Sequence, residues 1–169
     1  MNVGLLALRL ALGLLMAAHG AQKLLGWFGG HGLAGTGGFF EGLGFRPGRL
    51  FAATAALAEI GGGVLTALGL FGPVGPALMV SVMIVGAVSV HAANGLFAAK
   101  NGIELPLLYG VAAAALALTG PGSLSLDALL GLTHAWTPAV SWAVLAAGIL
   151  GGTANLALRR KPAPGPVAA

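Results

Sequence analysis

Five apolar segments, each about long enough to cross a lipid bilayer, make up most of this chain of 169 residues. They cover residues 3–25, 50–71, 74–98, 103–119 and 138–158. A membrane-spanning helix needs about 20 residues, with about 17 as the lower limit. The fourth segment is the shortest, and it reaches this limit only if Glu104 lies at the membrane boundary. We therefore predict an all-α membrane protein with a bundle of four transmembrane helices followed by a fifth, C-terminal transmembrane helix.

The charge content excludes most other classes of protein. Only 7% of the residues are charged, compared with about 25% in soluble domains. The few basic residues lie mainly in loops and at the C-terminus, so the basic balance indicates a lipid bilayer as partner and no nucleic acid. The chain has no Cys, which excludes disulfides, thiol redox chemistry and Cys-ligated iron–sulfur clusters within it.

The distribution of basic residues predicts the orientation. With five spans, seven basic residues fall on one side of the membrane, and the loops on the other side have none: Lys23, Arg46, Arg49, Lys100, Arg159, Arg160 and Lys161. Cytoplasmic loops are enriched in Lys and Arg. The pattern places the N-terminus outside and the C-terminus in the cytoplasm.

The connecting segments also carry information. Residues 26–49 are rich in Gly and aromatic side chains and predict an interfacial segment with a short helix at 39–43, either a connector or a lid over the bundle. Small residues at Gly61, Gly62 and Gly63, and at Gly148 and Gly152, permit close packing of helices. The tail, residues 162–169, is rich in Pro and Ala and is expected to be disordered.

Several polar side chains interrupt the apolar segments at a common depth. A charged side chain in hydrocarbon costs about 2.5–3.5 kcal/mol on insertion scales, so such residues mark ion pairs or functional sites. Counting 1.5 Å per residue from the segment ends, we expect six polar side chains to share the inner third of the bilayer. Four of them are ionisable and two are amides. We predict that His19, Lys23, His91 and Glu104 are catalytic, and that Gln22 and Asn94 bind the ligand.

Arg9 and Glu59 lie in the first two segments, and Glu59 is expected nearer to Arg9 than to the inner group. Arg pairs well with a carboxylate through its planar fork. We predict a structural ion pair between them that holds the first two helices together. A proton-relay role for Glu59 is the alternative.

His19 and His91 permit several interpretations. They can be hydrogen-bonded packing residues, a pair that handles protons or binds a quinone carbonyl, or axial haem ligands from two helices. Among cofactors the pattern favours quinone over haem. It predicts no metal site, because only Glu104 could add an anionic ligand.

An ordered series of short motifs is similar to a known family. It comprises His19-Gly20-Ala21-Gln22-Lys23-Leu24, Ala58-Glu59-Ile60-Gly61-Gly62-Gly63, Leu68-Gly69-Leu70, His91 with Asn94-Gly95, Glu104, Gly120-Pro121-Gly122 and Ser125-Leu126-Asp127. The series resembles the DoxX family of small bacterial inner-membrane proteins over residues 1–130. Residues 131–161, with the fifth segment, depart from the four-helix pattern of that family.

The resemblance implies two roles. One is a membrane subunit of a thiosulfate:quinone oxidoreductase, and the other is a membrane partner of superoxide dismutase and a sulfurtransferase in a thiol-redox complex. We therefore expect a subunit of a redox or quinone-linked system in the bacterial cytoplasmic membrane, working with a soluble redox protein. The alternative is a non-catalytic membrane scaffold or small-solute transporter.

Overall fold

The computed structural model describes residues 2–160 and is helical, with no β-strand in that part of the chain. Four of its helical segments are long and apolar enough to cross a membrane: α1 (Asn2–Leu25), α3 (Gly48–Leu68), the segment Val74–Asn94 and α7 (Pro138–Ala157). A fifth apolar helix, α5 (Glu104–Thr119), has 16 residues. The predicted all-α membrane fold is confirmed, and α7 is the predicted C-terminal transmembrane helix. The predicted disordered tail lies outside the described residues.

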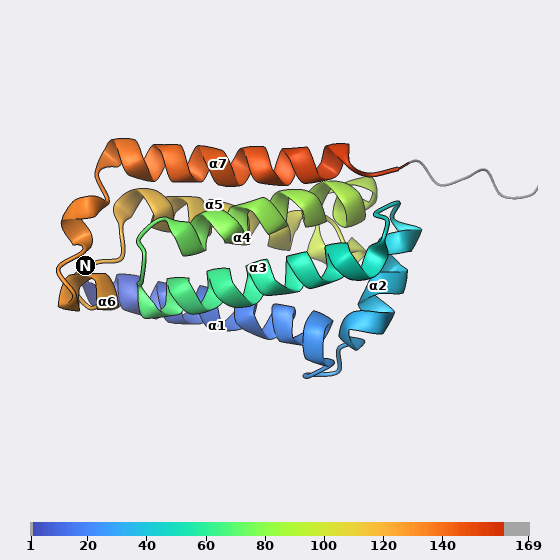
Figure 1. Ribbon diagram of the computed structural model, residues 1–169, viewed down its shortest axis with the longest axis horizontal. Coiled ribbons are helices and arrows are strands. Elements are labelled where there is room, and N and C mark those ends of the chain that lie inside the picture. The colour runs from blue at the N-terminus through green and yellow to red at the C-terminus, as the bar shows by residue number, and fades with distance from the viewer. Residues whose placement is uncertain (1, 161–169) are drawn as a thin grey trace, which may run out of the picture.

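The helices run back and forth along the long axis of the molecule (Figure 1). The N-terminus and the short helix α6 (Leu126–Leu129) lie at one end, and α2 (Gly32–Gly42) lies at the other. α1 and α7 both begin at the end that carries α6, and α7 ends at the α2 end (Figure 1).

Close packing of small residues sets the register of α1 against α3. A Cβ placed on Gly13 would lie 2.5 Å from the Gly63 carbonyl oxygen, and one placed on Gly63 would lie 2.4 Å from the Gly13 oxygen. Two turns further along α1, a Cβ on Gly20 would meet the Ala56 oxygen at 2.6 Å. Backbones can approach this closely only where side chains are absent. These contacts fix which residues of the two helices lie at the same depth.

The C-terminal helix packs by the same means. Gly148 of α7 meets the Ala77 carbonyl of α4 (Val74–Gly86), and Gly152 meets the Ser81 carbonyl one turn further on. Gly148 and Gly152 therefore act as the sequence predicts, and α7 lies directly against α4. Of the three glycines at 61–63, Gly62 and Gly63 pack tightly, whereas a Cβ on Gly61 meets nothing within 4 Å.

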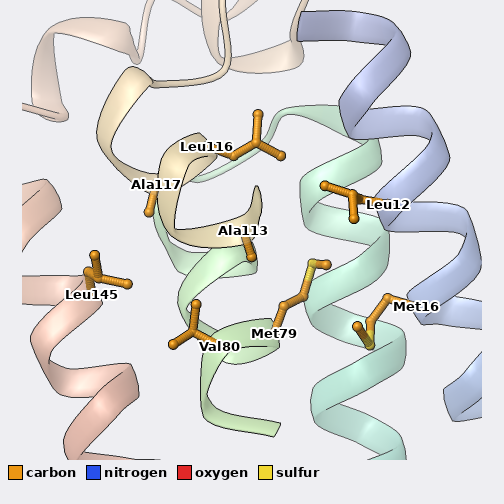
Figure 2. Close-up of a cluster of buried hydrophobic side chains, with 8 residues drawn as sticks. All are labelled: Leu12, Met16, Met79, Val80, Ala113, Leu116, Ala117 and Leu145. Carbon is orange, nitrogen blue, oxygen red and sulfur yellow. The ribbon is translucent and has the colours of Figure 1, made fainter. Parts of the chain in front are cut away.

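An apolar core joins α1, α4, α5 and α7 (Figure 2). The Met79 and Met16 side chains have no exposed surface, and Leu145 of α7 is 4% exposed. The core consists of Leu12, Met16, Met79, Val80, Ala113, Leu116, Ala117 and Leu145. Methionine fills irregular gaps between helices, which suits a bundle whose other contacts are mostly small residues.

The helix that begins as α4 changes its winding before it ends. It continues as a π-helical turn, Ala87–His91, and then as a 3-10 turn, Ala92–Asn94. The predicted span of residues 74–98 is therefore too long, because Gly95 has a positive φ of 83° and the chain turns back there. Residues 95–103 form a hairpin-like loop, in which Ile103 N–H donates to the Gly95 carbonyl. The helix predicted at 39–43 is also longer than expected and begins at Gly32.

Candidate functional site

A cavity of about 440 Å³ lies between the helices, towards the end that carries α2. α1, α3, α4 with its π-helical turn, and α5 form its walls, and Phe39 and Phe40 of α2 contribute aromatic surface. The volume lies within the range of small-molecule sites, which are mostly apolar with a few well-placed polar groups. The polar groups that matter here are His19, Lys23, Glu59, Ser89, His91 and Tyr109.

Lys23 and Glu59 form an ion pair in the cavity wall. Lys23 Nζ lies 2.8 Å from Glu59 Oε1 and 2.6 Å from Oε2. The Glu59 side chain is 3% exposed and that of Lys23 is 27% exposed. A buried carboxylate needs a partner of opposite charge. Lys23 supplies that charge, and its more accessible side chain leaves the ammonium in contact with the cavity.

The predicted ion pair between Arg9 and Glu59 is wrong. The register of α1 against α3 places Arg9 beside Gly69, where a Cβ would collide with the guanidinium. Gly69 lies ten residues beyond Glu59, which corresponds to about 15 Å along a helix. The sequence estimate of depth failed because it counted residues from segment ends, whereas the glycine contacts between the helices decide the register.

His19 is oriented by a neighbour on its own helix. Its Nδ1 lies 3.1 Å from Gln22 Oε1, and Gln22 Nε2 donates to the Phe28 carbonyl at 3.1 Å. The Phe28 oxygen can only accept, so the amide nitrogen must face it and Oε1 must face the histidine. His19 Nδ1 therefore carries a hydrogen. Tyr109 of α5 meets the His19 ring edge-on, with ring centroids 6.3 Å apart.

His91 is oriented by the backbone of the following loop. Its Nδ1 lies 2.8 Å from the Asn101 carbonyl oxygen, which also accepts from Asn94 Nδ2 at 3.2 Å. Asn101 adopts a left-handed conformation with φ of 59°, which asparagine tolerates better than most residues. Because a carbonyl cannot donate, His91 Nδ1 also carries a hydrogen. π-helical turns such as the one that ends at His91 are frequent at functional sites.

The structure thus brings three of the six predicted site residues together around one cavity: His19, Lys23 and His91. Gln22 and Asn94 do not line it: Gln22 hydrogen-bonds His19 directly, and Asn94 donates to the Asn101 carbonyl that holds His91. Glu104 is also absent from the lining, and its Oε2 accepts the Ala98 N–H at 2.7 Å within the 95–103 loop. The catalytic and ligand-binding roles assigned to these residues remain predictions.

Sequence reasoning missed several lining residues. Tyr109 is the only tyrosine of the chain, and its position five residues after Glu104 could have indicated that it shares the depth of the predicted site. Glu59 was assigned to the wrong partner and in fact belongs to the cavity. The aromatic residues of α2 lie in the predicted interfacial segment, but no pattern in residues 26–49 indicates which of them contact the cavity.

Comparison with known families gives one match. The family model described as DoxX matches residues 4–92, which is more than half of the chain. The chain belongs to the DoxX family. No curated protein and no solved structure matches it. The matched region of this DoxX protein contains His19, Lys23, Glu59 and His91, whereas Tyr109 and α7 lie beyond it.

A second polar cluster lies at the opposite end of the DoxX bundle. Asp127 is fully buried and accepts hydrogen bonds from the backbone N–H groups of Phe71 and Gly72 and from Trp136 Nε1, at 2.6–2.9 Å. Arg9 is 2% exposed and donates to the Leu124 carbonyl. These bonds tie the α3–α4 turn and the loop around α6 together. The void that Arg9 lines is about 10 Å³, too small for a ligand, so we interpret this cluster as a structural one.

Proposed function

We propose that this DoxX protein is the membrane subunit of a redox system, in which the cavity binds the ring of a quinone or quinol. The observation that carries the proposal is the cavity itself: an apolar and aromatic space of about 440 Å³, whose polar lining comprises two histidines, one tyrosine, one ion pair and the smaller side chains of Thr54, Ser81, Ser89 and Asn155. A quinone ring is flat and apolar with an oxygen at each end. The aromatic residues of α2 and α3 suit the faces of such a ring, and the polar groups suit its oxygens.

The polar side chains of the cavity wall have separate roles in this proposal. Lys23, held by Glu59, or His19 hydrogen-bonds one ring oxygen and fixes the orientation of the ring. His91, held by Asn101, exchanges the proton that accompanies electron transfer, since a positioned imidazole can act as a general acid or base. A soluble redox protein is proposed to supply or remove the electrons, since the chain has no Cys for thiol redox chemistry of its own.

We propose that the cavity faces the cytoplasm. Arg46, Lys100, Arg159 and Arg160 lie in or beside the connections at the α2 end and Arg49 lies in the first turn of α3, whereas residues 69–73 and 120–137 of the other end contain no Lys or Arg. Because cytoplasmic loops are enriched in Lys and Arg, this bias supports an orientation with α2 and the cavity at the cytoplasmic face of a bacterial inner membrane, within reach of a soluble partner. In a chain without native Cys, Lys100→Cys is expected to label only after permeabilisation, and His134→Cys in intact cells.

Binding of duroquinol and duroquinone to the detergent-purified protein tests the proposal. We expect saturable binding of at least one of the two rings, weakened about three- to tenfold by His91→Ala or His19→Ala, which is the value of one hydrogen bond. His134→Ala is the matched control, because His134 lies at the opposite end of the bundle and outside the cavity. If neither ring binds, or if all three variants behave alike, the redox proposal fails and the scaffold or small-solute transporter alternative replaces it.

A further inference from the structure

Both cavity histidines are held in the same tautomer, and this restricts the ligand. His19 Nδ1 donates to the Gln22 amide oxygen, which the Phe28 carbonyl keeps in place. His91 Nδ1 donates to the carbonyl of Asn101. A neutral imidazole carries one hydrogen, so in each ring the remaining nitrogen, Nε2, is a bare acceptor.

Five titratable side chains line the cavity: Lys23 and His19 from α1, Glu59 from α3, His91 from the π-helical turn and Tyr109 from α5. The charges of Lys23 and Glu59 cancel each other. With neutral imidazoles the walls would carry no net charge, which suits an uncharged ring as the ligand.

A pair of acceptors discriminates between the two redox forms of a quinone. A quinone offers two carbonyl oxygens, which only accept, and these have no hydrogen to give to a bare Nε2. A quinol offers two hydroxyl groups, each of which donates one hydrogen and still accepts through its oxygen. The oxygen of a quinol can therefore donate to a histidine and accept from the Lys23 ammonium at the same time.

We infer that the cavity selects the reduced, hydroxyl-bearing ring, with Nε2 of His19 and of His91 as the acceptors of its O–H groups. The inference rests on the proposed function and specifies its ligand class. Gln22 and Asn101 are positioning groups in this arrangement: they touch the histidines and not the ligand. The preference follows from hydrogen bonds made within the protein before any ligand enters.

The test compares three rings under anaerobic conditions with the intact, detergent-purified protein: duroquinol, duroquinone and the dimethyl ether of duroquinol. The ether keeps the ring and both oxygens but has no O–H group. We expect duroquinol to bind about tenfold more tightly than either of the other two, since only duroquinol can donate two hydrogen bonds to the neutral histidines. Equal or tighter binding of duroquinone overturns the inference but leaves the proposed function standing, and absence of binding by every ring overturns both.

A second readout does not depend on ligand binding. In protein labelled with ¹⁵N-histidine, NMR is expected to show two imidazoles that are protonated at Nδ1 and bare at Nε2, and the His19→Ala and His91→Ala variants identify them. Hydrogen at Nε2 in both rings overturns the inference.

A variant at Gln22 tests its positioning role. Gln22→Leu removes the acceptor of His19 Nδ1 and is expected to reduce the preference for duroquinol about threefold, whereas His134→Ala, outside the cavity, preserves the preference. If Gln22→Leu keeps the full preference while the protein stays folded, Gln22 does not act through the tautomer of His19 and the assignment is overturned.

Discussion

The ion pair between Lys23 and Glu59 predicts a marked asymmetry between two single substitutions. Replacing Lys23 by Met leaves the Glu59 carboxylate, which is 3% exposed, without its partner. Loss of one partner from a buried pair costs about 3–5 kcal/mol. Replacing Glu59 by Gln leaves Lys23 without its charged partner. The Lys23 side chain is 27% exposed and lies near the end of α1, so it can extend towards the membrane surface. That substitution is expected to cost about 1.5–3 kcal/mol, the value of hydrogen bonds to a charged group.

The double variant tests whether the effects of the two substitutions are coupled. In Lys23→Met with Glu59→Met no charge remains buried, and replacement of a buried pair by apolar side chains is often close to neutral. We expect its stability to lie nearer to that of the unmodified protein than either single variant. The coupling free energy between the two positions is then large, and it offsets part of the stability that the two single substitutions lose, as is expected for residues in contact.

The assay is reversible unfolding in mixed micelles, with increasing SDS and circular dichroism as the signal. Lys100→Met is the control, because Lys100 is exposed in the loop after the π-helical turn and a substitution there is expected to change stability by less than about 0.5 kcal/mol. Equal costs for the two single variants, or strictly additive costs in the double variant, would refute the account of Glu59 as a carboxylate that depends on Lys23.

Further predictions follow from the packing and from the distal cluster. Gly63→Ala is expected to cost about 1–3 kcal/mol through overpacking against α1, whereas Gly61→Ala on the same helix meets open space and is tolerated; equal melting temperatures for the two would contradict the predicted contact. Gly148→Ala is expected to loosen α7, and Gly151→Ala is the control, since its Cβ meets only the Ser81 hydroxyl at 3.7 Å. Asp127→Ala leaves three donors without their acceptor and is expected to cost about 3 kcal/mol or more in the same SDS titration.

The sequence predicts the fold well because a bilayer permits few alternatives. Long apolar segments can satisfy their backbone groups in hydrocarbon only as helices or closed barrels, so length and hydropathy were sufficient to place α1, α3 and α7. The packing roles of Gly62, Gly63, Gly148 and Gly152 could also be predicted, since small residues within apolar helices are typical of helix contacts.

The site was harder to predict, because it depends on the relative positions of helices. His19, Lys23 and His91 were recognised from their depth, and depth was sufficient because each lies near the α2 end of its helix. Glu59 was paired with the wrong residue because the Gly13–Gly63 contact, and not the number of residues from a segment end, sets its level. The roles of Gln22 and Asn101 depend on single hydrogen bonds that no periodicity encodes.

The most direct measurement of the central claim is the amount of quinone and quinol extracted from the purified protein, determined by mass spectrometry. It requires a variant in which the cavity is filled without disturbing the bundle. Gly86 lines the cavity and a Cβ there meets nothing within 4 Å, so Gly86→Leu is that variant, and Gly61→Leu, which adds the same side chain outside the cavity, is its control. We expect close to one ring per chain in the unmodified protein and in Gly61→Leu, and a loss of most of the bound ring in Gly86→Leu. Absence of quinone and quinol from all three, or equal amounts in all three, would contradict it.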